Sequence, residues 1–260
     1  MESTPKVTVI TIVYNEVRNL EKTIKSVLSQ TYSNLEYLVI DGGSTDGSIQ
    51  VIKNFEDKID FWQSESDNGV FDAMNKGIKK ASGDYVNFMN AGDSFFNCNI
   101  IEDVFNLNHN SADFIYGDHE VIYDTFKKEK KALPTYYLWK HMIFSHQSLF
   151  VKTLLLKENP FDLSFKIAAD FNFIFNSFIE GKTFFNTELK IAIYAAGGKS
   201  ESGVIQAYKE NWKVVKKHRK SLKVRFFHFQ LITKQYIIIL FRMILPEKIF
   251  EKIMKAKNSI

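Results

Sequence analysis

The chain has 260 residues, a net charge of +4 and one cysteine, Cys98. Its length suffices for one substantial core with an accessory segment, and the single cysteine excludes an intramolecular disulfide and a cysteine-based zinc site. The mild charge predicts no nucleic-acid partner, while the lone cysteine and the lack of a basic, then apolar, secretory signal in MESTPKVTVI favour a cytoplasmic protein.

Apolar runs alternate with helical patterns in the N-terminal part of the chain. Strands are predicted at Val7–Tyr14, Leu35–Ile40, Ile59–Gln63 and Tyr85–Met89. Between them the spacing of apolar residues predicts helices at Glu16–Gln30, after a cap at Ser44 or Asp46, and at Phe71–Ala81. Strands and helices that alternate in this way pair in parallel through right-handed crossovers. We therefore predict an α/β fold with a Rossmann-like, mostly parallel central sheet flanked by helices.

The pattern changes after Asn97. Strands are predicted at Phe114–Tyr116, Glu120–Tyr123 and Lys190–Tyr194, helices at Ala169–Ile179 and Ser202–His218, and a charged loop at Lys127–Lys131. These elements extend one domain over residues 1–218, with a nucleotide-binding half at about 6–97 and an acceptor half at about 98–218.

The tail, residues 219–260, differs in character from this domain. It combines many aromatic and aliphatic residues with Lys and Arg, and Pro246 is expected to separate two helices. Its uninterrupted apolar stretch is shorter than the ~20 residues of a spanning helix, and Lys234 and Arg242 would be costly within a bilayer. We predict an amphipathic helical extension that lies on a membrane surface, or else packs on its own domain or on a second subunit.

Polar clusters follow the strands. Ligands in open α/β sheets bind beyond the carboxyl ends of the strands. Asp41 ends the second strand, where it can accept hydrogen bonds from a base or ribose, or cap the turn. Gly42 and Gly43 could let the backbone approach a ligand, although they do not form a GxGxxG fingerprint and follow the second strand, which argues against a dinucleotide site.

Three further positions carry potential chemistry. Asn90-Ala91-Gly92-Asp93 follows the fourth strand, where one carboxylate and one amide oxygen can reach Mg²⁺ or Mn²⁺ or simply form an Asx turn. Asp170 opens a helix, which suits either a cap or a base that is ionised at neutral pH. His146 lies in an apolar run and is either a structural residue or a ligand.

Taken together, these segments resemble the family 2 inverting, nucleotide-sugar-dependent glycosyltransferases, which have the GT-A fold. The resemblance covers about residues 6–200 and is carried by VTVITIVYNE, LEYLVIDGGSTDGS, SDNGVFDAMNKG, GDYVNFMNAGD, IYGD, SHQSLF and IAADFNF. It is greatest to bacterial members that build capsule, O-antigen or exopolysaccharide units.

The resemblance implies a role for each matching residue. Those expected to bind the substrates are Thr11, Tyr14, Glu16, Asp41, Gly43, Asp72, Asn90, Asp118 and His146. Of these, the first four hold the base and ribose, Asp72 lines the donor pocket, Asp118 lies near the acceptor cleft, and His146 lies near the diphosphate or the acceptor. Asp170 is the implied catalytic base, and Asp93 takes the metal-binding place of the family's DxD motif, of which only this last carboxylate remains.

The implied function is transfer of a sugar, with inversion, from a nucleotide diphosphate sugar to a hydroxyl of a saccharide acceptor in cell-surface polysaccharide biosynthesis. A UDP-linked donor, a divalent metal (Mn²⁺ or Mg²⁺), a lipid-linked acceptor and a peripheral place at the inner face of the cell membrane are expected with it. A non-catalytic nucleotide-sugar binding or scaffold protein is the alternative, supported by the reduced DxD motif. A nucleotidyltransferase is expected to have a basic, glycine-rich phosphate loop after the first strand. This chain has VYNEVRN there, which argues against that class.

Overall fold

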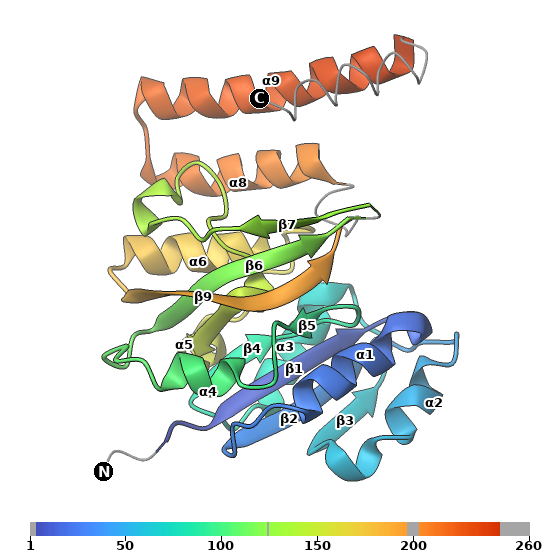
Figure 1. Cartoon of the computed structure of the whole chain (residues 1–260). Coiled ribbons are helices and arrows are strands. Elements are labelled where there is room, and N and C mark those ends of the chain that lie inside the picture. The colour runs from blue at the N-terminus through green and yellow to red at the C-terminus, as the bar shows by residue number, and fades with distance from the viewer. Residues whose placement is uncertain (1–3, 124, 197–202, 245–260) are drawn as a thin grey trace.

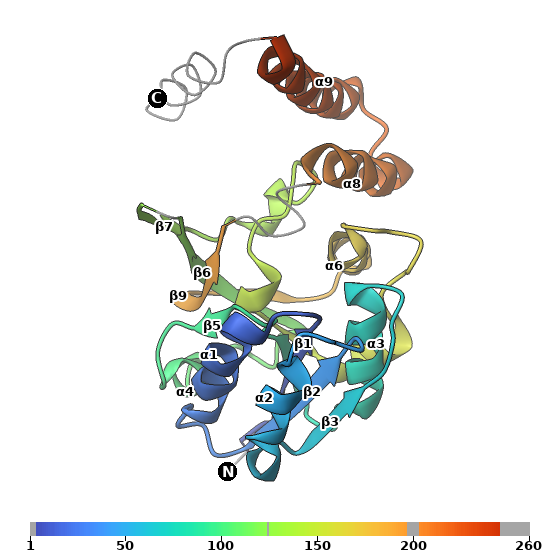
Figure 2. The same cartoon turned by 90° about the vertical axis from the view of Figure 1, so that its right-hand side faces the viewer.

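The computed structural model describes residues 4–123, 125–196 and 203–244. Its strands form one nine-stranded sheet in the order β3-β2-β1-β4-β8-β6-β9-β5, and β7 pairs with β6 beside this path. Helices cover both faces of the sheet, and two further helices form an outer layer at one end (Figures 1 and 2).

The first half of the sheet is parallel throughout. Its strands are β1 (Val7–Val13), β2 (Leu35–Asp41), β3 (Phe61–Ser64) and β4 (Tyr85–Phe88), with β1 between β2 and β4. The connecting helices are α1 (Val17–Leu28), α2 (Ser48–Lys53), η1 (Glu56–Lys58) and α3 (Val70–Lys80). The predicted Rossmann-like half and its alternation of strands and helices are confirmed.

The second half is mixed. β8 (Leu149–Lys152) lies antiparallel to β4 and to β6 (Phe114–Ile122), whereas β9 (Phe184–Ala195) runs parallel to β6. β5 (Ser94–Phe95) pairs antiparallel with β9. The two short strands predicted between residues 114 and 123 form the single strand β6, whose pairing with β9 shifts register around Asp118.

The charged loop predicted at Lys127–Lys131 is wrong. These residues form strand β7 (Lys127–Lys130), which pairs antiparallel with β6. The side chains of β7 show no apolar face, but backbone hydrogen bonds to β6 are enough to form an edge strand. Lysines on such an edge oppose pairing with other chains.

The remaining helices are α4 (Ile100–Phe105), η2 (Thr135–Tyr137), η3 (His146–Ser148), α5 (Thr153–Glu158), α6 (Ala169–Ile179), α8 (Val204–His218) and α9 (Leu222–Ile244). Sequence periodicity did not predict α4 or α5, each six residues long. The second tail helix expected beyond Pro246 lies outside the described residues. No helix in the described part of the chain is both long and apolar enough to span a bilayer.

Two apolar cores lie on the two faces of the sheet. Ile10 and Ile12 of β1 belong to one core, and Val7, Val9 and Val13 belong to the other. Successive side chains of a strand point to opposite faces of the sheet, so a strand that is buried on both faces contributes to both cores. This burial fixes β1 at the centre of the first half and leaves its carboxyl end to meet the loops that carry the polar clusters.

Candidate active site

The carboxyl ends of the parallel strands form one edge of the molecule. In Figure 1, β1, β2 and β4 point toward the side on which α6 begins, although α6 belongs to the second half. Residues that follow these strands are therefore on the same side as the first turn of α6. This is the edge at which open α/β sheets bind ligands.

Asp41, the last residue of β2, is fully buried. Its Oδ2 accepts hydrogen bonds from the backbone N–H of Gly43 at 3.0 Å, the backbone N–H of Ser44 at 2.9 Å and the hydroxyl of Ser64 at 2.6 Å. Its Oδ1 has no partner among the described residues. One oxygen thus caps the turn, which is one of the two roles expected for Asp41. The other oxygen can still accept a hydrogen bond from a ligand.

The backbone after Asp41 is closely approached from two sides. A Cβ atom on Gly42 would overlap the Asp67 carboxylate and come within 3.3 Å of the Tyr14 ring, and Gly43 has a φ of +82°. Tyr14 itself is 61% exposed. Sequence reasoning singled out Tyr14 and Gly43 but missed Asp67, whose signal was the Asp-Asn-Gly turn in which its Oδ1 accepts a hydrogen bond from Gly69 N–H at 2.8 Å.

Thr11 and Glu16 lie close to this edge but are engaged in other contacts. The Thr11 hydroxyl is buried, 3.0 Å from the Tyr37 hydroxyl. The Glu16 carboxylate accepts a hydrogen bond from the Asn19 amide at 2.6 Å, at the beginning of α1. Their roles toward a base and ribose stay predictions, because both side chains satisfy partners of their own.

The turn after β4 meets η3. Asp93 N–H donates to the Asn90 carbonyl at 2.9 Å, and Gly92, between them, has a φ of +99°. The Asn90 amide nitrogen lies 3.0 Å from His146 Nε2, and the Gln147 amide donates to Asp93 Oδ2 at 2.8 Å. The structure therefore brings the predicted residues Asn90, Asp93 and His146 together, and adds Gln147, which sequence reasoning had not selected.

Burial perturbs the titration of this cluster. It raises the pKa of Asp93 to about 7, against the opposing effects of the Gln147 hydrogen bond and the positive charge of Lys22. Burial also lowers the pKa of His146 to about 4, so this imidazole is neutral at physiological pH. A carboxylate whose negative charge is so poorly compensated would gain from a nearby cation.

The cluster fits a divalent cation only in part. Asn90 Oδ1 is buried and has no hydrogen-bond partner in the described part of the chain, and it lies in the same turn as Asp93. The described residues contain no group of three or more His, Cys, Asp or Glu side chains that could hold a metal ion. These donors suit a hard cation that takes one carboxylate, one amide oxygen and the remaining ligands from phosphate and water.

Asp170 stands in the first turn of α6. Burial raises its pKa to about 6, although Phe171 N–H donates a hydrogen bond to its Oδ1 at 2.7 Å. The loop before α6 is tied to the first half: the Asn75 side chain on α3 exchanges two hydrogen bonds, each 2.9 Å, with the backbone of Phe161. The loop that leads to this carboxyl group of raised pKa is thereby connected to α3 of the first half.

The carboxylates of Asp72 and Asp118 form contacts within the protein. Asp72 Oδ2 accepts a hydrogen bond from Asn68 N–H at 2.9 Å, where it caps α3. Asp118 is buried; its Oδ2 lies 2.7 Å from Lys131 Nζ, and its Oδ1 accepts Ala132 N–H at 2.8 Å. Both Asp118 oxygens and one Asp72 oxygen are thus engaged within the protein, and the expected places of these residues in a donor pocket and an acceptor cleft stay predictions.

A parallel, Rossmann-like half with an acidic edge, joined to a mixed half that supplies a further carboxylate to the same side, defines a transferase of the GT-A fold. A family model described as glycosyl transferase family 2 matches residues 8–175. The chain belongs to this family and is a glycosyltransferase.

Individual relatives agree with this assignment. The chain is 35% identical over 181 residues to an uncharacterised glycosyltransferase of Mycobacterium tuberculosis, covering 67% of this chain and 69% of the relative. Among solved structures, S. aureus TarS 1–349 in complex with UDP-GlcNAc matches with a TM-score of 0.63 at 16% identity, over 88% of this chain and 71% of TarS 1–349. The match covers only 39% of a longer TarS chain.

An archaeal structure has a similar fold. The mannosyltransferase PcManGT from Pyrobaculum calidifontis, in complex with GDP-Man and Mn²⁺, matches with a TM-score of 0.62 at 15% identity, over 99% of this chain and 81% of that one. Identities this low establish the shared fold, and the α/β, GT-A fold predicted from the sequence is confirmed.

Proposed function

We propose that the protein transfers one sugar, with inversion, from a UDP-linked donor to a hydroxyl of a saccharide acceptor, and that this acceptor is lipid-linked and belongs to a cell-surface polysaccharide. The observation that carries the proposal is Asp170: a half-buried carboxylate with a pKa near 6 in the first turn of α6, a helix that begins on the side toward which β1, β2 and β4 point. A group of this kind is ionised at neutral pH and still basic enough to accept a proton.

The donor would lie over the carboxyl ends of β1 and β2. Tyr14 offers an exposed ring beside Gly42, and Asp41 retains one buried oxygen to which no described residue donates a hydrogen bond. A flat ring and a carboxylate oxygen suit a nucleoside, by stacking and by hydrogen bonding respectively. That S. aureus TarS has been solved with UDP-GlcNAc supports a uridine donor, and the GDP-Man complex of the archaeal enzyme leaves a guanosine donor for the experiment to exclude.

The reaction is a single displacement. The acceptor hydroxyl gives its proton to Asp170 as its oxygen forms a bond to the anomeric carbon. The bond from that carbon to the diphosphate oxygen breaks, and its electron pair leaves with the nucleoside diphosphate. Because attack comes from the face opposite the leaving group, the configuration inverts. Asp170 ends protonated and returns the proton to solvent.

Asp93 and Asn90 would hold a divalent cation, Mn²⁺ or Mg²⁺, together with the diphosphate. When bound, such an ion supplies positive charge beside the leaving group. The residues themselves orient that site: Gln147 fixes the Asp93 carboxylate, and neutral His146 fixes the Asn90 amide. A DxD motif with one remaining carboxylate is consistent with this arrangement, in which the substrate supplies the other ligands of the cation.

A donor screen followed by product analysis tests the chemistry. Thermal unfolding with Mn²⁺ and a panel of UDP-, GDP- and dTDP-sugars should show a raised midpoint for one nucleotide class, because a ligand of the folded state stabilises it by mass action. Proton NMR of the product made from that donor should show the opposite anomeric configuration. Retention of configuration would refute the mechanism. Donor binding without turnover on lipid-linked or free saccharides would favour the non-catalytic alternative.

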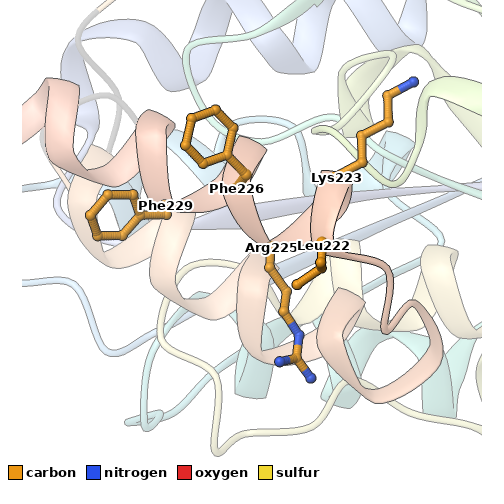
Figure 3. Close-up of a pocket in the computed structure, with 5 residues that line it drawn as sticks. All are labelled: Leu222, Lys223, Arg225, Phe226 and Phe229. Carbon is orange, nitrogen blue, oxygen red and sulfur yellow. The ribbon is translucent and has the colours of Figure 1, made fainter.

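We further propose that α9 holds the enzyme at the inner, anionic face of the cell membrane. Helix α9 exposes apolar side chains along its length: Leu222, Phe226, Phe229, Tyr236, Ile237, Ile239, Leu240, Phe241 and Ile244. At its beginning, an open depression of about 580 Å³ is lined by Leu222, Lys223, Arg225, Phe226 and Phe229 (Figure 3).

The positive charge near the beginning of α9 favours an anionic bilayer as the partner. Lys223 and Arg225 extend away from the two phenyl rings in Figure 3, and the last turn of α8 carries Lys216 and Lys217. Exposed aromatic rings among cations match the interface of an anionic bilayer, where each Lys or Arg near the surface contributes about 1 kcal/mol.

Vesicle co-sedimentation tests this surface. The double variant Phe226→Ser and Phe229→Ser should lose binding to vesicles that contain phosphatidylglycerol. The matched control, Leu154→Ser and Leu163→Ser, changes two side chains of similar exposure elsewhere and should bind as the parent does. Equal binding of both variants would remove the membrane proposal, and a change in oligomeric state of the first variant alone would point to a second subunit instead.

A further inference from the structure

The backbone segment that leads into α6, residues 166–168, is capped from another helix. This segment ends at Ala168, the N-cap residue of α6, which has no side chain that could accept hydrogen bonds at the helix N-terminus. Glu210, on α8, accepts the hydrogen bonds that the backbone N–H groups of this segment donate. Its Oε1 lies 3.1 Å from Lys166 N, and its Oε2 lies 3.0 Å from Ile167 N and 2.9 Å from Ala168 N.

Glu210 is itself held in place. It is only 6% exposed, and the Gln206 amide, one turn earlier on α8, donates to its Oε1 at 2.7 Å. Burial alone would raise its pKa, but the hydrogen bonds from Gln206 and from the backbone bring the pKa below its ordinary value. The carboxylate is therefore a fixed negative charge at neutral pH.

The capped segment ends two residues before Asp170, the proposed base. We propose that Glu210 is a positioning residue for sugar transfer: by binding the backbone of residues 166–168 it fixes the first turn of α6, and with it the carboxylate of Asp170. This inference rests on the proposed role of Asp170. It assigns α8, which lies beyond the family match, to the catalytic unit.

Glu210 also acts on Asp170 through its charge. Its negative charge adds to the effect of burial in raising the pKa of Asp170. Other charged groups on the flanking segments have different contacts: Asp162 accepts a hydrogen bond from Ser164 N–H, Lys166 is exposed, and Lys213 of α8 lies over the Phe165 ring at 4.6 Å. Glu210 thus holds the backbone next to Asp170 and adds to the rise in the pKa of Asp170 that burial causes.

The test compares Glu210→Gln with Glu180→Gln in the full chain. Both remove one negative charge near α6, but Glu180 is exposed at the opposite end of the helix. In Glu210→Gln an amide N–H₂ must face backbone donors. Hydrogen exchange at the amides of residues 166–168, followed by mass spectrometry, should accelerate on the order of tenfold in this variant and stay unchanged in the control.

Kinetics supply the second measurement. With Glu210→Gln, kcat should fall on the order of 10- to 100-fold, because small displacements of a reacting group carry losses of this size. The KM for the donor should change less than about twofold, and the acid limb of the pH profile should move to lower pH. Gln206→Leu, which keeps Glu210 but removes the amide that orients it, should show the same pattern with smaller amplitude and serves if Glu210→Gln does not fold.

The outcomes separate the two proposals. Unchanged exchange at residues 166–168 overturns the positioning role whether or not the protein transfers sugar. If exchange accelerates in Glu210→Gln but the parent protein turns over no donor, the cap is upheld and the proposed function is refuted. Accelerated exchange with an unmoved acid limb and unchanged kcat overturns the catalytic consequence of the cap.

Discussion

Replacing Asp170 with Asn should remove most of the transfer activity and leave the fold intact. The substitution is nearly isosteric, and the new amide oxygen can still accept the hydrogen bond that Phe171 N–H donates at 2.7 Å. What disappears is the proton acceptor. Loss of a general base lowers kcat by about 10²- to 10⁴-fold. Release of nucleoside diphosphate in the presence of acceptor measures this, and the donor KM should stay within about twofold.

The same substitution should raise stability. Burial lifts the pKa of Asp170 from 3.8 to about 6. Since the folded pKa lies above the unfolded one, the stability linked to the protonated carboxyl is complete below pH 3.8 and is lost as the pH rises through about 6. At neutral pH the loss is at most about 3 kcal/mol. Asn cannot ionise, so Asp170→Asn should melt about 5 °C higher at neutral pH and show no gain near pH 4.

Asp162→Asn provides the matched control. Asp162 lies on the exposed loop before α6, where hydrogen bonds from Ser164 lower its pKa. This variant should keep full activity and gain no stability. The reasoning would be refuted if Asp170→Asn retained a kcat within about threefold of the parent, or if it melted at a lower temperature than the parent at neutral pH.

Three other substitutions test separate features. Asp118→Asn removes the ion pair with Lys131 and should cost about 2 kcal/mol in urea unfolding; a raised acceptor KM at full stability would instead support its place in an acceptor cleft. Gln147→Leu should raise the pKa of Asp93 further and weaken Mn²⁺-dependent donor binding about tenfold at neutral pH, by calorimetry; equal affinity would contradict this. Glu36 has a pKa lowered to about 2 by hydrogen bonds that outweigh its burial, so its stabilisation is complete above pH 4.5 and lost as the pH falls through about 2. Glu36→Gln should therefore melt lower at neutral pH, with a gap that narrows toward about pH 3, and an equal gap at both pH values would oppose the reasoning.

The fold was predictable where local pattern and tertiary environment agree. β1 and β2 are mostly apolar and almost entirely buried because both faces of the sheet are covered, and α1 shows one apolar face. β7 was not predictable, because four charged residues form a strand only through their pairing with β6. Strand formation depends on the neighbour as much as on the residues themselves.

The site was predictable to the extent that it follows strand ends. Asp41, Asp93 and the start of α6 could be placed because the carboxyl ends of parallel strands share one edge. Gln147 could not be placed, since its hydrogen bond to Asp93 joins residues 54 apart in the sequence. The two residues lie next to β4 and β8, whose antiparallel pairing no local pattern reveals. Asp67 was equally hidden, because its relation to Gly42 arises only where two loops meet.

Which of the aspartates can do chemistry is a question of how many donors each one receives. Asp46 is exposed and has its pKa lowered by hydrogen bonds from Ser48 and from the backbone, and Asp118 has a partner for each oxygen. Asp93 and Asp170 are the opposite case, since burial outweighs the hydrogen bonds they receive and raises the pKa of both. In the sequence all four are aspartates beside predicted strands or helices, and the sequence motif cannot separate them. Folding separates them by supplying donors to some and withholding donors from others, and the two left short of donors are those proposed to meet a cation and an acceptor proton.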